Sequence, residues 1–333
     1  MRARGAAVTV ALLAALAGCS GDPDAGPASP TGPSTPNSSS ASGPATTPTP
    51  SPEPTADPSP VRPARFAVDR ALRHVEALAG RIGPRLATSP AFRDAAAYVG
   101  GELTRQGYAV RRQRFPVPAG DSWGVPVAAG RSFNVVAEPP GFDPTRPYLL
   151  VGAHLDTVAV APGAEDNASG VSVLLELARL ASRDGTRLPV VLVAFGAEEP
   201  RGPGDDLHHF GSQHLVRELT GPERRNLRAM VSLDRVGVGG LVPVCTGGLS
   251  SGRVRDRLLR TARAEGIAAA GCSDNRSSDH WSFEKAGFDV ARLGSTPYAA
   301  YHSADDRPDV LQPEQLARTG RLVWAWLRTR PTG

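Results

Sequence analysis

Residues 190–200, VVLVAFGAEEP, join an apolar run to two adjacent carboxylates, Glu198 and Glu199. A run of six apolar residues that ends at a glycine turn is typical of a buried strand. The two neighbouring glutamates repel each other and do not continue the apolar pattern. We therefore expect a chemical function for this pair at the end of the strand.

Two other strand-like runs lead into residues of the same kind. Residues 148–151 precede His154 and Asp156, and residues 230–233 lead directly into Asp234. In open α/β sheets, ligands bind beyond the carboxyl ends of the strands. We expect these side chains and the glutamate pair to converge at one rim of a sheet.

Short strand patterns alternate with longer helical patterns along the chain, which favours an α/β fold. We predict one globular domain with a mixed, mainly parallel central sheet and helices on both faces. The predicted strands are residues 110–115, 133–137, 148–151, 190–195, 230–233 and 290–293, and the predicted helices are residues 66–78, 91–106, 168–180, 211–219, 252–264 and 313–329.

Further metal-binding side chains come from two other segments. The stretch GAEDNASG, residues 163–170, places Asp166 at the start of a predicted helix, where the helix dipole favours a carboxylate. An N-terminal cap is an equally good explanation of Asp166 taken alone. His302 adds a second imidazole to His154, and this mixture of nitrogen and oxygen donors suits zinc.

Charge favours two zinc ions over one. Two ions bring four positive charges, and Asp166, Glu199 and Asp234 with one hydroxide would neutralise them. Asp166 could bridge the two ions. Asp156 is expected to accept a hydrogen bond from the second ring nitrogen of His154 and so fix its tautomer.

Adjacent residues in a turn point in different directions, so the two glutamates can have different roles. We assign Glu199 to metal binding and Glu198 to the general base that takes a proton from the attacking water. Burial would raise the pKa of that base towards the working pH.

Together these segments resemble the zinc aminopeptidases of the M28 metallopeptidase family, which have a zinc-exopeptidase (phosphorylase/hydrolase-like) fold. The resemblance rests on GAHLDTV, GAEDNASGVSVLLELA, FGAEEPRG, FGSQHLV, SLDRVG, SSDHWSF and YHSADDRPDVL, which occur in this order over residues 148–311. It implies an enzyme that hydrolyses N-terminal residues from peptides.

The resemblance also implies roles for single residues. His154 and Asp234 would hold one zinc ion, Glu199 and His302 would hold the other, and Asp166 would bridge them. Glu198 would be the base, and Tyr301 would help to polarise the substrate carbonyl. A cis peptide bond after Asp166 is implied as well.

Some residues depart from this pattern or fall outside it. Arg235 follows Asp234 where the family commonly has an apolar residue, which leaves the charge and specificity of the pocket open. We expect residues 200–210, with Asp205, Asp206, His208 and His209, to form a solvated loop; the alternative is that they shape the pocket. Asp279 and His280 are expected to be structural.

The N-terminal region is expected to direct export. Residues 1–18 carry two arginines and then an apolar stretch too short to span a membrane, as in a signal peptide. The sequence LAGC resembles a lipobox, so Cys19 would carry lipid and hold the protein at the extracytoplasmic face of a cell membrane; an ordinary cleaved signal is the alternative. Residues 19–64, rich in Pro, Ser and Thr, would form a disordered tether before the peptidase domain, residues 65–333.

Composition adds weaker constraints. A net charge of +4 with cations scattered along the sequence does not argue for nucleic acid binding. Cys245 and Cys272 could form one disulfide in an oxidising compartment or remain free thiols. Oligomeric state and side-chain preference stay open.

The sequence leaves three other functions open. Residues 248–252, GLSSG, match the nucleophile elbow of serine hydrolases, with Ser250 as the nucleophile. A binding module that has lost its chemistry would keep the fold, but all the expected ligand positions are intact. A glutaminyl-cyclase-like enzyme with a single zinc ion would use the same scaffold.

Overall fold

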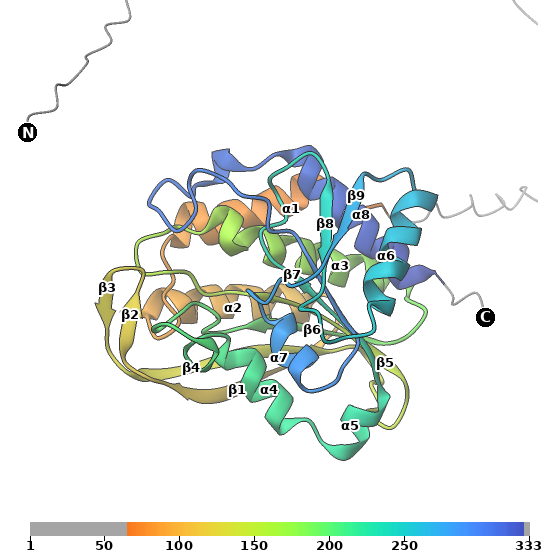
Figure 1. Cartoon of the computed structure of the whole chain (residues 1–333), viewed down its shortest axis with the longest axis horizontal. Coiled ribbons are helices and arrows are strands. Elements are labelled where there is room, and N and C mark those ends of the chain that lie inside the picture. The colour runs from red at the N-terminus through yellow and green to blue at the C-terminus, as the bar shows by residue number, and fades with distance from the viewer. Residues whose placement is uncertain (1–64, 330–333) are drawn as a thin grey trace, which may run out of the picture. The chain divides into compact units, whose positions relative to one another are not determined.

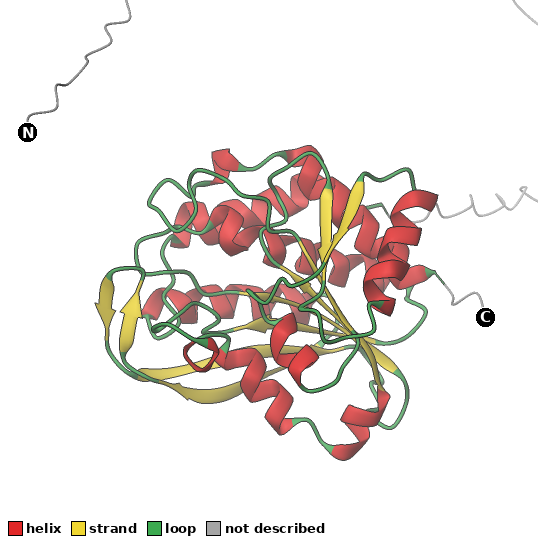
Figure 2. Ribbon diagram, viewed as in Figure 1, coloured by secondary structure: helices red, strands yellow, loops and turns green. Residues whose placement is uncertain are grey.

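An eight-stranded mixed sheet forms the centre of the protein (Figures 1 and 2). The computed structural model describes residues 65–329, so the expected signal peptide, Cys19 and the tether lie outside the described residues. The middle strands β6, β5, β7 and β10 are parallel, whereas β1, β4 and β8 join the sheet in antiparallel pairs. In spatial order the strands are β1 (Ala109–Val117), β4 (Gly130–Glu138), β6 (Val190–Phe195), β5 (Tyr148–His154), β7 (Leu227–Leu233), β10 (Val290–Leu293), β8 (Val242–Cys245) and β9 (Ala269–Cys272).

Helices cover both faces of the sheet, as predicted. In Figure 1, α1, α3 and α8 lie above the sheet and α4 lies below it. The helices are α1 (Val68–Val75), which continues as the π-helix η1 (Glu76–Ile82), α2 (Pro90–Arg105), α3 (Gly170–Asp184), α4 (Phe210–Glu218), α5 (Gly221–Asn226), α6 (Arg253–Ala264), α7 (His280–Lys285) and α8 (Pro313–Arg328). None of the helices in residues 65–329 has the length and apolarity that a membrane span needs.

The central strands are apolar throughout because both of their faces are buried. Along β5, Leu149 and Val151 belong to the core cluster under α1, α2, α3 and α8, whereas Tyr148 and Leu150 pack in the cluster under α4. A parallel strand between two helical layers has this continuous apolar pattern.

Each predicted strand and helix overlaps an observed element, but several short elements were not predicted. These are β8, β9, α5, α7 and the separate hairpin of β2 (Gly120–Ser122) and β3 (Val125–Val127). Strands β8 and β9 also explain the cysteine pair. Cys245 and Cys272 face each other in the register of these two strands and are joined in a disulfide.

Candidate metal centre

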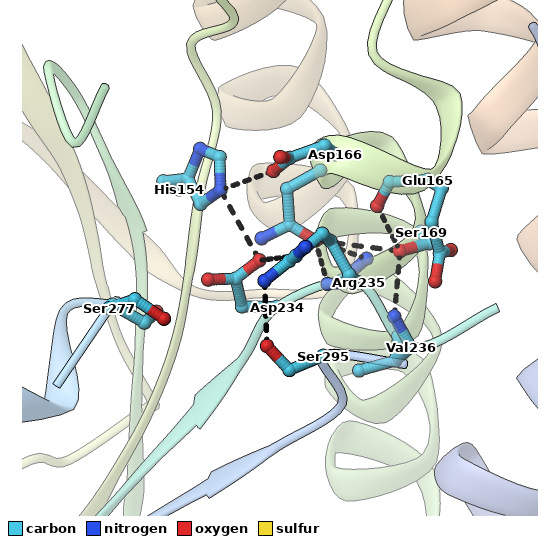
Figure 3. A network of polar contacts seen from close by, with 12 residues as sticks. His154, Glu165, Asp166, Ser169, Asp234, Arg235, Val236, Ser277 and Ser295 are labelled. Atoms are coloured by element: carbon cyan, nitrogen blue, oxygen red, sulfur yellow. Dashed lines mark hydrogen bonds and ion pairs between the residues drawn. The ribbon is translucent and has the colours of Figure 1, made fainter. Parts of the chain in front are cut away.

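The predicted rim exists at the carboxyl ends of three adjacent parallel strands. His154 is the last residue of β5, the glutamate pair follows β6, and Asp234 follows β7 directly. Asp166 comes from the short helical turn η2 (Ala164–Ser169), and His302 comes from the loop between β10 and α8. All five predicted ligands are buried. Figure 3 shows His154 between the carboxylates of Asp166 and Asp234.

The two oxygens of the Asp166 carboxylate face different histidines. Its Oδ1 lies 3.0 Å from His154 Nε2, which is also 3.6 Å from Asp234 Oδ1. Its Oδ2 lies 3.2 Å from His302 Nε2, which is also 3.3 Å from Glu199 Oε2. Each histidine is thus paired with its own carboxylate, and Asp166 is shared between the two pairs.

Electrostatics at this cluster favour positive charge. Burial alone would lower the pKa of His154, but Glu198 and the hydrogen bond with Asp166 raise it well above its usual value. Burial and the neighbouring Asp166 raise the pKa of Glu199 to about 8. Glu199 Oε1 and Asp234 Oδ1 are buried without a hydrogen-bond partner among the described residues. A donor set of two imidazoles, three carboxylates and orphaned oxygens fits divalent zinc.

Close donor atoms form two overlapping groups: His154 with Asp166 and Glu199, and His154 with Glu198 and Asp234. Glu198 therefore lies near enough to share a metal ion, in addition to the base role predicted for it. Arg292, fully buried on β10, donates to Asp234 Oδ2 at 2.8 Å. This contact holds the Asp234 carboxylate in place with its Oδ1 near His154.

The loop around Asp166 is fixed by its own polar contacts. The peptide bond between Asp166 and Asn167 is cis, as the family resemblance implied. Asn167 Oδ1 accepts from the backbone of Gly170, and the carboxylate of Asp306 accepts from the backbone N–H groups of Glu165 and Asp166. A Cβ atom at Gly170 would lie 2.4 Å from Asn167 Oδ1, so only glycine fits there.

The prediction for Asp156 was wrong in its partner. His154 Nδ1 lies 3.1 Å from the backbone oxygen of Asp156 and 4.0 Å from its carboxylate. That carboxylate instead accepts from the backbone N–H groups of Glu198 and Glu199, at 3.0 and 3.2 Å. The side chain therefore positions the glutamate turn, and the histidine tautomer is set by a carbonyl. An isolated sequence spacing of two residues could not distinguish these acceptors.

The expectation of a solvated loop over residues 200–210 was also wrong in part. His209 is only 3% exposed, and its Nε2 lies 3.2 Å from Glu198 Oε1. Burial would lower the pKa of His209, but its hydrogen bond to Glu198 raises it. His208 lines the cavity that also contains Glu198 and Glu199, whereas Asp205 and Asp206 are exposed. A left-handed backbone at His209 turns its side chain inward, which composition does not reveal.

Aromatic and basic residues complete the cavity above the cluster, which holds about 100 Å³. Tyr301 stacks on His302 with ring centroids 3.7 Å apart, and the guanidinium of Arg235 lies over the Tyr301 ring at 4.5 Å. Trp123, at the tip of the β2–β3 hairpin, meets the His302 ring edge-on at 4.3 Å. Trp123 was not among the predicted site residues, because two three-residue strands carry almost no periodic pattern.

Other predicted residues lie outside the cluster. Ser250 Oγ has no hydrogen-bond partner in residues 65–329, so no histidine activates it as a serine nucleophile would require. His280 Nε2 lies 2.7 Å from the backbone oxygen of Asn275, which agrees with a structural role. Asp279 is fully buried, and burial together with nearby Glu198 raises its pKa to about 8.

Comparisons with known proteins place this chain in a family. The family model described as "Peptidase family M28" matches residues 134–327. Aminopeptidase YwaD of Bacillus subtilis is 32% identical over 187 residues, which are 53% of this chain and 40% of that protein. The chain thus spans less than half the length of this curated relative.

Solved structures share the fold at lower identity. A zinc aminopeptidase from Bacillus subtilis, BSAP, superposes with a TM-score of 0.70 at 20% identity, over 78% of this chain and 94% of that one. A glutaminyl cyclase from Bacteroides thetaiotaomicron superposes with a TM-score of 0.68, also at 20% identity, over 80% and 99% of the two chains. At this identity the likeness establishes the fold alone, because one fold supports several activities.

Proposed function

Because the chain belongs to peptidase family M28, we propose that it is a zinc-dependent exopeptidase, an aminopeptidase that removes N-terminal residues from peptides. The observation that carries this proposal is the shared Asp166, whose two oxygens lie 3.0 and 3.2 Å from the Nε2 atoms of two different histidines. A carboxylate in this position suits two metal ions held side by side.

We propose two zinc ions per chain. The contacts between the predicted ligands indicate which residues would hold each ion. His154 and Asp234 would hold one ion, Glu199 and His302 would hold the other, and Asp166 would bridge them. When bound, zinc acts as a Lewis acid on the substrate carbonyl and lowers the pKa of water towards about 7.

Glu198 is proposed as the general base. Its carboxylate lies in the cavity beside the ligand cluster, and His209 holds one of its oxygens at 3.2 Å. From this position it would take the proton of the attacking water and return it to the leaving amine. The Tyr301 hydroxyl, whose pKa burial and Asp166 raise above its usual value, stays protonated and would donate to the carbonyl oxygen.

The cavity supports cleavage at a chain end. Its volume of about 100 Å³ is far below the several hundred Å³ that larger ligands occupy, which favours the binding of a single terminal residue. The free amine of the substrate would lie among the buried carboxylates, which attract its positive charge.

A panel of amino-acyl reporter substrates tests this function. Free aminoacyl reporters should be hydrolysed, their N-acetylated counterparts should not, and a chelator should abolish the activity. Equal cleavage of acetylated substrates would contradict an aminopeptidase. Conversion of N-terminal glutamine to N-terminal pyroglutamate with release of ammonia, with one zinc ion per chain, would instead identify the cyclase activity.

Replacement of Glu198 tests whether this residue acts as the general base or as a metal ligand. Glu198→Ala should keep its zinc content and lose turnover by about two to four orders of magnitude, since a base contributes roughly this factor. Zinc analysis and kcat measured on the same samples check the prediction, with the exposed Glu218→Ala as the control. Loss of zinc in Glu198→Ala would make Glu198 a ligand, and full activity would remove it from the mechanism.

We also propose that the protein is exported and held at the extracytoplasmic face of a cell membrane through lipid on Cys19, with residues 19–64 as the tether of the peptidase domain. The lipobox-like LAGC supports this proposal.

A further inference from the structure

A second cavity, of about 280 Å³, lies at the amino ends of the central strands, opposite the ends that carry the candidate metal centre. It is lined by Leu149 and Ala229, near the starts of β5 and β7, and by residues of α6 and α8. His154 lies five residues beyond Leu149 on the same strand, which separates the cavity from the metal centre by about 17 Å.

Arginines dominate the lining of this cavity, which we call the arginine cavity. They come from the segment before β6, from β7 and from α6, so they gather only in the folded chain. The five arginines are Arg187, Arg228, Arg253, Arg257 and Arg260, and the two acids that line the same cavity are Asp256 and Asp289.

Most of this positive charge is not neutralised by the protein. Asp256 accepts from Arg255, and Asp289 accepts from the Ser251 hydroxyl. The guanidinium groups of Arg228 and Arg257 have no hydrogen-bond or ion-pair partner in residues 65–329, and those of Arg253 and Arg260 have none either. Five arginines against two acids leave an excess of positive charge around the cavity, which attracts anions.

Two buried donors of the lining are also without partners. Trp326 is fully buried and its Nε1 has no acceptor among the described residues, and the same holds for Arg187 Nη2. The Arg187 guanidinium lies over the Trp326 ring at 5.2 Å, and burial together with Arg257 lowers its pKa. A buried donor without an acceptor costs free energy, so an acceptor-rich ligand would be stabilised here.

We propose that the arginine cavity binds an anion that carries two phosphate groups. Planar guanidinium groups match phosphate oxygens in bidentate pairs, and several arginines from different elements could surround two such groups. The volume of 280 Å³ fits a small bisphosphate. The phosphates could belong to a soluble metabolite or to a lipid headgroup, since both present the same oxygens.

Binding measurements on the zinc-loaded full chain with the substitution Cys19→Ser, which removes the proposed lipid site, distinguish these sources. One arm titrates fructose 1,6-bisphosphate by calorimetry in phosphate-free buffer. The other measures sedimentation with phosphatidylcholine vesicles that contain cardiolipin, against phosphatidylcholine alone. Binding in the first arm alone indicates a soluble ligand, and binding in the second alone indicates a headgroup; either supports the site.

Matched variants test whether the cavity is responsible. Arg228→Gln/Arg257→Gln removes two charges from the lining, whereas Arg114→Gln/Arg131→Gln removes two exposed charges on β1 and β4. We expect at least about tenfold weaker binding for the first and none of this loss for the second. Thermal melts check folding, and Arg253→Gln/Arg260→Gln, both exposed, serves if the first variant is unstable. Equal losses in cavity and control variants, or no binding in either arm, would overturn the proposal.

Discussion

Among single residues, Glu198 and Glu199 are distinguished by their partners. Glu199 lies 3.3 Å from His302, a predicted metal ligand, whereas Glu198 lies 3.2 Å from His209, which is not a predicted ligand. The carboxylate of Asp156 accepts hydrogen bonds from the backbone N–H groups of both glutamates and so fixes the backbone of their turn. The turn thereby brings Glu199 beside His302 and Glu198 beside His209, while Glu198 also lies close to His154 and Asp234.

Replacement of His209 should change the pH dependence of activity. Burial would raise the pKa of Glu198, but His154 and the hydrogen bond from His209 hold it below its usual value. In His209→Leu the pKa of Glu198 should rise, so the base is protonated at a higher pH. The acid limb of kcat/KM against pH should move to higher pH, while His209→Gln, which keeps a donor, should move it less. An unchanged acid limb in His209→Leu would show that His209 does not act on the base.

At the scale of elements, strand ends were the most predictable feature. Long apolar runs located β5, β6 and β7, and the residues that follow them led to His154 and Asp234. Short elements and long-range contacts were not predictable. The β2–β3 hairpin that carries Trp123 has too few residues for a periodic pattern, and Arg292 becomes a partner of Asp234 only through the pairing of β7 with β10.

The disulfide between Cys245 and Cys272 joins the edge strand β9 to its neighbour β8. It closes a loop with a sequence separation of 27, for which chain entropy predicts about 3.5 kcal/mol of stabilisation. The double variant Cys245→Ser/Cys272→Ser should therefore unfold at lower urea concentration. Reduced wild-type protein should match the variant. An unchanged urea midpoint would mean that the bond does not form in solution.

At the scale of the whole molecule, the lipid anchor can be tested independently of catalysis. Cells that express the full chain should retain it in the membrane fraction, and Cys19→Ser should release it. Detergent phase partitioning measures this difference. Hydrophobic partitioning that is the same with and without Cys19 would contradict lipidation and favour an ordinary signal peptide.

The central claim is that five side chains from separate parts of the fold hold two zinc ions around Asp166. Anomalous diffraction at the zinc edge, on crystals of the zinc-loaded protein, tests it most directly. We predict two peaks, one beside His154 and Asp234 and one beside Glu199 and His302, with Asp166 between them. A single peak, or none in contact with Asp166, would contradict the proposed centre.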